Sequence, residues 1–284
     1  MKVVNYYTPC IESFDKTGSL KTALSTNEQL TVLKKMAEEW GIDLENAERW
    51  MKGDEYKSQR KLAVSFTTLA TEVVDKVESI FGKKLEGEVR LSPSLMRFDG
   101  FARYDSGSHA VWFGIDHPDA DEGYLKALMA HELSHVYRDH QPKVWSFLGK
   151  PLTDVSRKEY LDAMTAHEHI TSEGLATLFS QLVYPEVPLH LHHYYFPEEM
   201  QWCLANYSKI DKAIIDCLKT DQEIWKFYED DIIEEGSPSR TQYYWSARKI
   251  NEWLTTNHVK SPSDYKTALI QAHGWHAGEF LCFQ

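Results

Sequence analysis

The sequence predicts an α+β protein that is mostly helical and has one small mixed sheet. Most of the chain shows apolar residues at three- and four-residue spacing, which is typical of amphipathic helices. Short strand-like runs separated by turn residues occur between residues 87 and 116. Helices therefore precede and follow a single sheet, and this order indicates an α+β fold rather than an alternation of strands and helices.

The N-terminal part, residues 1–86, is predicted to be a helical region packed on the core. Its longest helix should end at Gly82, because glycine is favoured just after the last turn of a helix. Before that glycine an apolar stripe recurs at helical spacing: Phe66, Leu69, Val73, Val77 and Ile80. At Gly87 the sequence changes from helical spacing to short strand-like runs, without an intervening linker. We therefore place the start of the second domain there.

Residues 87–284 are predicted to form this second domain. Two runs, "GEVRLSPS" and "FARYDSGSHAVWFGID", read as strands with a turn at residues 105–107. Ser156 and Glu159 form a capping box that opens a long helix. Ser237–Pro238, a cap followed by proline, opens a later one. In order, the predicted elements are a sheet at 87–116, a motif helix at 122–138, a helix at 157–183 and C-terminal helices within 197–274.

The composition disfavours several classes of partner. Acidic residues number 43 against 31 basic ones, a net charge of −12, and such a surface repels nucleic-acid backbones. No signal-peptide pattern and no apolar run long enough to span a membrane is present. The cysteines have no paired spacing, so we expect reduced and mostly buried thiols at Cys10, Cys203, Cys217 and Cys282. We therefore expect a cytoplasmic protein that binds neither nucleic acid nor membranes.

The stretch "LMAHELSHVYRDH", residues 128–140, combines two histidines and a glutamate inside a helical pattern. His131 and His135 are four residues apart, so a helix directs both imidazoles to one face. Glu132 lies about 100° further round the helix, beside that point without being a ligand. This is the HExxH arrangement of zinc peptidases. Chance gives about 0.05 such matches in a chain of this composition, and the alternative is a surface helix with incidental histidines.

A catalytic zinc ion needs a third protein ligand, with water in the fourth position. Glu173 is the preferred candidate, because Gly174 beside it would let its helix press against the two histidines. The alternative is an incidental glycine, which costs about 1 kcal/mol of helix propensity. His169, one turn earlier, could itself be the ligand, although we expect it to support a ligand by hydrogen bonding. The other candidates are Asp139, His140, Asp162, His167 and Glu168.

The segments "HELSHVYR" and "SEGLATLF" together resemble the gluzincin group of zinc metallopeptidases. They look most like the predicted zinc-dependent protease families of unknown function whose signature is HExxH followed by an EGLA-like segment. The resemblance covers about residues 87–254 and implies a zincin-like catalytic domain. The best-known gluzincins carry an acid four residues after the glutamate ligand, where this chain has Thr177. We expect Thr177 and His169 to lie around the ligands. The implied ligands of one zinc ion per chain are His131, His135 and Glu173.

The resemblance also implies where a peptide substrate binds and what stabilises the oxyanion. In this group an edge strand before the motif helix binds substrate backbone. "TQYYWSARKINEWL" resembles the helix that carries the oxyanion-stabilising tyrosine, which points to Tyr243 or Tyr244. The two side chains point about 100° apart, so at most one can serve; we favour Tyr243, and core packing is the alternative for either. The strand "HAVWFGID" supplies the expected substrate-binding residues His109, Val111, Trp112 and Phe113.

The predicted function is hydrolysis of peptide bonds in peptides or small proteins. Zinc would lower the pKa of a bound water from about 15.7 toward 7, and Glu132 would act as general base and then as general acid. The alternatives are a zinc amidohydrolase that is not a peptidase and a regulatory or binding protein on a zincin scaffold. His190, His192 and His193 raise the alternative of a second metal site, but no acid lies near them in the sequence.

Overall fold

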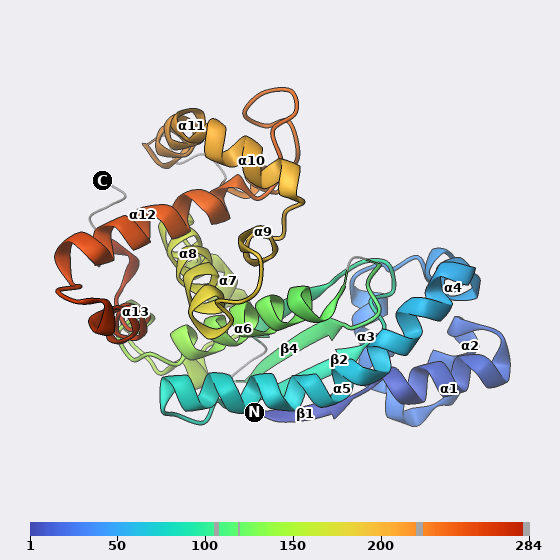
Figure 1. Ribbon diagram of the computed structural model, residues 1–284. Coiled ribbons are helices and arrows are strands. Elements are labelled where there is room, and N and C mark those ends of the chain that lie inside the picture. Colours follow the sequence, from blue (N-terminus) through green and yellow to red (C-terminus); the bar gives the residue numbers. More distant parts are fainter. Residues whose placement is uncertain (105–107, 119, 220–223, 281–284) are drawn as a thin grey trace. The chain divides into compact units, whose positions relative to one another are not determined.

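The computed structural model describes residues 1–104, 108–118, 120–219 and 224–280 (Figure 1). The chain divides into two compact units, the first made of Met1–Arg103 and Ser108–Glu132 and the second of Tyr104–Gly107 and Leu133–Gln284. The division falls within α6 (Glu122–Asp139), so this continuous helix contributes residues to both units. It does not coincide with the boundary predicted at residue 87, because the N-terminal residues share the first unit with the sheet.

The first unit contains a small sheet of four strands in the order β1-β2-β4-β3. The strands β1 (Lys2–Asn5), β2 (Glu88–Ser92) and β4 (His109–Gly114) are parallel, with Val3 opposite Val89 and Val89 opposite Val111. The fourth strand, β3 (Gly100–Tyr104), lies beside β4. The turn predicted at residues 105–107 lies outside the described residues.

The sequence suggested that the N-terminal region is helical throughout. In the structure it also contributes one strand, β1, to the sheet. The segment "KVVN" is too short to show the alternation of apolar and polar residues by which a strand is recognised, although its two valines favour extended backbone. The longest helix does end at Gly82, which adopts φ 65, and four of the five predicted stripe residues are buried. The helices before the sheet are α1 (Tyr7–Thr17), α2 (Leu20–Thr26), η1 (Glu28–Leu30), α3 (Thr31–Glu39), α4 (Leu44–Lys52) and α5 (Asp54–Phe81).

The strand expected to bind substrate, β4, is not an edge strand. It pairs with β2 on one side and lies beside β3 on the other, and all six of its residues are buried. Among the described strands, β1 and β3 form the two edges, and β3 is the edge strand next to β4. The prediction for "HAVWFGID" was wrong in this respect, because the order of strands in a sheet depends on long-range pairing and leaves no mark in a single strand.

The second unit is helical in its described residues. The helix predicted over 157–183 is two helices, because Thr165 interrupts it: its side chain accepts a hydrogen bond from Glu168 N and caps the second helix. The helix expected to open at Ser237–Pro238 begins three residues later, after Arg240, which adopts φ 59. The helices are η2 (Ser146–Leu148), η3 (Leu152–Asp154), α7 (Arg157–Ala163), α8 (Ala166–Val183), α9 (Leu189–His192), α10 (Pro197–Ala205), α11 (Tyr207–Lys219), η4 (Ile224–Tyr228), α12 (Thr241–Asn257), η5 (Pro262–Asp264), α13 (Tyr265–Ala272) and η6 (Ala277–Glu279).

The helices α8 and α12 form the centre of this unit (Figure 1). They approach closely at Gly174: a Cβ there would lie 2.8 Å from the backbone carbon of Ser246 and 2.8 Å from Ile250 Cδ1. The sequence correctly suggested that Gly174 permits a close approach, but the partner is α12 rather than the motif helix. Because α8 carries Glu173 and α12 carries Tyr243, this contact positions two predicted site residues relative to each other.

Two further observations concern the expectations about membrane-spanning segments and about the cysteines. No helix in the described part of the chain is both long and apolar enough to cross a membrane. Cys10 and Cys203 are buried thiols, and burial raises the pKa of each to about 12. Cys282 lies outside the described residues.

Candidate metal centre

The HExxH motif lies in the middle of α6, as predicted. The helix starts where Asp121 Oδ1 accepts a hydrogen bond from Tyr124 N, 2.7 Å away. Its apolar side chains are buried, and so are the first histidine and the glutamate of the motif, with exposed fractions of 1% for His131 and 8% for Glu132. A surface helix with incidental histidines would not bury these groups, so the burial argues against that alternative.

Three predicted residues come together at one point. His131, His135 and Glu173 each offer one ligand atom, and the three atoms lie within 4.8 Å of one another. The distance from His135 Nε2 to Glu173 Oε2 is 3.5 Å. Two imidazole nitrogens and one carboxylate oxygen are a donor set of catalytic zinc sites. The residues therefore fit a zinc ion with an open coordination position.

His135 is oriented by a residue that the sequence analysis missed. A hydrogen bond of 2.8 Å joins His135 Nδ1 to Ser172 Oγ. A hydrogen bond to the far nitrogen of a histidine holds the ring and so fixes the direction in which the other nitrogen points. Ser172 directly precedes Glu173 on α8, so its position in "SEGLATLF" was the available signal.

Glu132 is held by the edge strand of the first unit. Its Oε2 accepts a hydrogen bond of 2.7 Å from the backbone N–H of Ala102 in β3. Gly100, at the start of β3, permits this approach, since a Cβ there would lie 2.9 Å from Leu128 Cδ2 on α6. The backbone of β3 and the carboxylate beside the metal ligands are thus in direct contact.

His169 lies beside Glu173 rather than replacing it. Its Nδ1 is 3.7 Å from Glu173 Oε1, and burial lowers the pKa of His169, so that its ring is neutral near pH 7. Its Nε2 is 3.2 Å from the hydroxyl of Tyr228. The ring of Trp225 lies against it, with the ring centroids 4.3 Å apart. His169 therefore packs beside the candidate ligand Glu173, but at a distance longer than the hydrogen bond that the sequence analysis expected.

The two candidate tyrosines have different surroundings, as their helical spacing predicted. The hydroxyl of Tyr243 is 2.9 Å from that of Tyr228. Burial and then the charge of Glu173 raise the pKa of Tyr243 well above its usual value, which keeps this phenol protonated. The hydroxyl of Tyr244 instead accepts a hydrogen bond from Arg248, and its ring packs against His193, with centroids 5.6 Å apart. Of the two, Tyr243 is the one near a candidate ligand.

Several other residues that the sequence offered as site candidates have contacts away from the cluster or are buried. The carboxylate of Asp139 accepts hydrogen bonds from Trp145 Nε1 (3.1 Å) and the hydroxyl of Tyr160 (2.9 Å). Thr177 is buried, and its hydroxyl has no hydrogen-bond partner among the described residues. The expected substrate-binding residues of β4 are all buried within the sheet: His109, Val111, Trp112 and Phe113.

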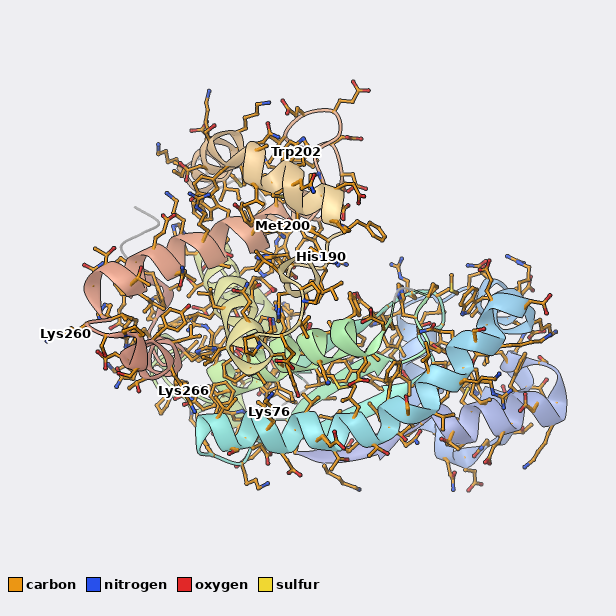
Figure 2. The ribbon with its side chains drawn as sticks, viewed as in Figure 1. Lys76, His190, Met200, Trp202, Lys260 and Lys266 are labelled. Atoms are coloured by element: carbon orange, nitrogen blue, oxygen red, sulfur yellow. The ribbon has the colours of Figure 1, made fainter. Side chains whose placement is uncertain are left out.

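The histidines at 190 to 193 do not form a second metal cluster. His190 lies on the short helix α9 (Figure 2). His192 Nδ1 is 2.9 Å from Ser180 Oγ, and the His193 ring stacks on Tyr195. In the described part of the chain, these three histidines belong to no group of His, Cys, Asp or Glu residues close enough to hold a metal.

A buried ion pair connects the motif helix to the glutamate helix. Arg138 and Glu168 are 1% and 4% exposed, and two hydrogen bonds of 2.7 and 2.8 Å join the guanidinium to the carboxylate. Arg138 also donates to the backbone oxygens of His273 (3.1 Å) and Trp275 (3.0 Å). The pair thereby joins one end of the motif helix to the first turn of the helix that carries Glu173.

Comparison with known families agrees with this geometry. Residues 24–252 match the model of the family described as "Putative zinc dependent peptidase (DUF5700)". The chain belongs to this family. The matched residues of this DUF5700 protein include both α6 and α8, so all three ligand-type residues lie within the region that defines the family. No curated protein and no solved structure matches the chain.

Proposed function

We propose that this DUF5700 protein is a gluzincin-type zinc peptidase with a zincin-like catalytic domain. The observation that carries the proposal is the convergence of His131, His135 and Glu173 within 4.8 Å. The described residues contain one such cluster, which supports binding of one zinc ion. When bound, zinc would activate a water molecule and polarise the carbonyl of the scissile bond.

The protein groups around the cluster support the binding of that ion. The hydrogen bond between His135 Nδ1 and Ser172 Oγ holds the ring so that Nε2 points toward Glu173, and in the tautomer that binds zinc through Nε2 the Nδ1–H would donate to Ser172. His169 lies next to the other oxygen of Glu173 and limits the rotation of that carboxylate. The zinc affinity should therefore depend on Ser172 and His169 as well as on the three ligands.

Glu132 is the proposed general base and then general acid. Its carboxylate would take a proton from the attacking water and deliver it to the leaving nitrogen. The hydrogen bond from Ala102 N to Oε2 fixes the orientation of this carboxylate. A carboxylate held by a backbone donor keeps one orientation while it gains and loses the proton, and this favours catalysis over a purely structural metal site.

Tyr243 is the proposed oxyanion donor. Its phenol stays protonated at neutral pH, because its pKa lies well above the usual value. It can therefore donate a hydrogen bond to the negative charge that develops on the carbonyl oxygen. Tyr244 packs against His193 instead.

The proposed substrate is a peptide or small protein, with its backbone beside β3. Of the two edge strands among those described, β1 and β3, this is the one that supplies the N–H that contacts Glu132. An exposed edge can pair with an extended peptide by strand addition. The buried thiols Cys10 and Cys203 fit a reducing compartment such as the cytoplasm.

The test combines metal analysis with digestion of a peptide library. The zinc-loaded protein should cleave peptides, and Glu132→Gln should bind zinc normally but lose about 10²–10⁴-fold in kcat. Glu122→Gln is the matched control: it makes the same change on the same helix, at an exposed side chain that pairs with Lys126. Cleavage of no peptide by the zinc-loaded protein, or equal activity of the Glu132→Gln variant, would contradict the proposal.

A further inference from the structure

Tyr228 connects two groups of the candidate centre. It ends η4, fifteen residues before Tyr243 in sequence, and its hydroxyl lies 2.9 Å from the hydroxyl of Tyr243 and 3.2 Å from His169 Nε2. Nothing in the sequence distinguished it from the other tyrosines. Its single hydroxyl therefore has hydrogen-bond partners on both α8 and α12.

One hydroxyl can take part in both hydrogen bonds at once, accepting from one neighbour and donating to the other. In the arrangement that makes Tyr243 the acceptor, His169 Nε2–H donates to the oxygen of Tyr228, and the Tyr228 O–H donates to the oxygen of Tyr243. The distances of 3.2 and 2.9 Å allow this arrangement. A phenol that accepts a hydrogen bond keeps its own proton to donate, and cooperativity makes it a better donor.

The rings around Tyr228 hold this hydroxyl in place. Its ring meets that of Tyr243 edge-on, with centroids 5.9 Å apart at 88°, and stacks on Trp225, with centroids 6.3 Å apart at 20°. The residue is nevertheless 37% exposed. Its two hydrogen-bond partners are buried, with exposed fractions of 6% for His169 and 8% for Tyr243, so this hydroxyl links two buried polar groups of the candidate centre.

We propose that Tyr228 is a positioning residue that donates a hydrogen bond to Tyr243 and thereby aims the Tyr243 proton at the oxyanion of the substrate. This inference rests on the proposed peptidase function. Tyr228 acts through Tyr243 and does not itself touch the reacting atoms. Its effect should therefore appear in kcat and should vanish when the Tyr243 hydroxyl is absent.

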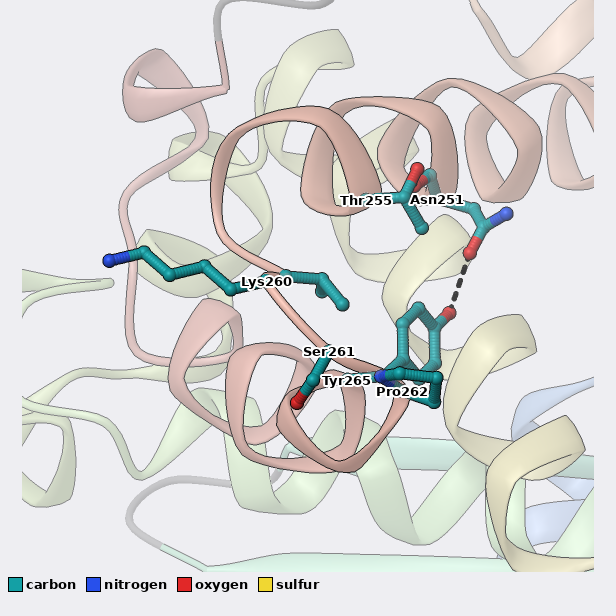
Figure 3. Close-up of a pocket in the computed structure, with 7 residues that line it drawn as sticks. Asn251, Thr255, Lys260, Ser261, Pro262 and Tyr265 are labelled. Atoms are coloured by element: carbon teal, nitrogen blue, oxygen red, sulfur yellow. Dashed lines mark hydrogen bonds between the residues drawn. The ribbon is translucent and has the colours of Figure 1, made fainter.

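The first test is Tyr228→Phe, which keeps the ring contacts and removes the hydroxyl. We expect kcat to fall by about 10–100-fold, the range found for groups that orient active-site residues, with KM and zinc content unchanged. The matched control is Tyr265→Phe, which removes a phenol that donates to Asn251 Oδ1 (2.8 Å) at a separate surface pocket (Figure 3). Asn251 lies on the same helix as Tyr243, roughly 12 Å further along it. This control should retain full activity.

The second test is a double-mutant cycle. In a Tyr243→Phe background, Tyr228→Phe should cause no further loss of kcat, because the two hydroxyls act as one unit. A readout that does not depend on turnover is the affinity for a phosphinic peptide, which imitates the tetrahedral transition state. Calorimetry should show that Tyr228→Phe weakens this affinity and that the cycle is again non-additive.

Three outcomes would overturn the inference while leaving the proposed function in place. They are an unchanged kcat in Tyr228→Phe, a loss of zinc in that variant, and additive losses in the double variant. An unmodified, zinc-loaded protein that cleaves no peptide would instead remove the proposed function. The two failures are therefore distinguishable.

Discussion

Gly174→Ala should destabilise the protein, although alanine is the better helix former. The new Cβ would lie 2.8 Å from Ser246 C and 2.8 Å from Ile250 Cδ1, whereas non-bonded carbon atoms prefer about 3.5–4.0 Å. Relieving this overlap costs about 1–3 kcal/mol, and the gain in helix propensity offsets at most about 1 kcal/mol. Because Ser246 C belongs to the backbone and cannot rotate away, we expect a net loss of about 1–2 kcal/mol.

Urea unfolding followed by circular dichroism would measure this loss as a lower midpoint at an unchanged slope. Ile250→Val removes the Cδ1 atom, so in a double-mutant cycle it should recover part of the loss but leave the part due to Ser246 C. A Gly174→Ala variant that is more stable by about 1 kcal/mol, as propensity alone predicts, would refute the close approach of α8 and α12.

Three further predictions concern metal, pH and catalysis. Either His131→Ala or His135→Ala should remove most of the zinc, measured by metal analysis of the purified protein; full occupancy in either variant would exclude that ligand. Burial lowers the pKa of His273 to about 3, so the folded protein keeps this ring neutral where the unfolded chain, with a pKa of about 6.5, would protonate it. Stability should therefore fall as the pH drops from about 6.5 toward 3, and His273→Gln should flatten that part of the unfolding curve; an unaltered slope would assign the effect to other groups. Tyr243→Phe should lower kcat by about 10²–10³-fold, whereas Tyr244→Phe should leave kcat nearly normal; equal kinetics in the two variants would discard the tyrosine hypothesis.

The sequence predicted well those features that depend on local spacing. The motif helix was expected at 122–138 and extends over Glu122–Asp139, because its apolar period and its acidic start are both local. His131 and His135 lie on one face of the helix because they are four residues, about one helical turn, apart. Glu173 was chosen because Gly174 beside it would let its helix press against the two histidines; Gly174 does permit a close helix contact, but with α12 instead of the motif helix.

Features that depend on long-range contacts could not be predicted. The strand order that places β3 rather than β4 at the edge is set by pairing between distant segments. The role proposed for Tyr228 depends on how η4 folds against α8 and α12, and no residue spacing encodes it. The break at Thr165 was missed because the apolar pattern continues across it, and one capping side chain outweighs that pattern locally.

The ion pair between Arg138 and Glu168 affects how much the segment between these two residues can change. It joins two residues 30 positions apart in sequence, one just after the second motif histidine and one just before the glutamate ligand. The ends of the intervening segment are thus tethered independently of its length, and lengthening such a segment costs only about 0.6 kcal/mol per doubling. Variants of this chain should therefore be able to gain, lose or exchange residues between these two helices, and so carry new surfaces beside the candidate metal centre, without moving Glu173.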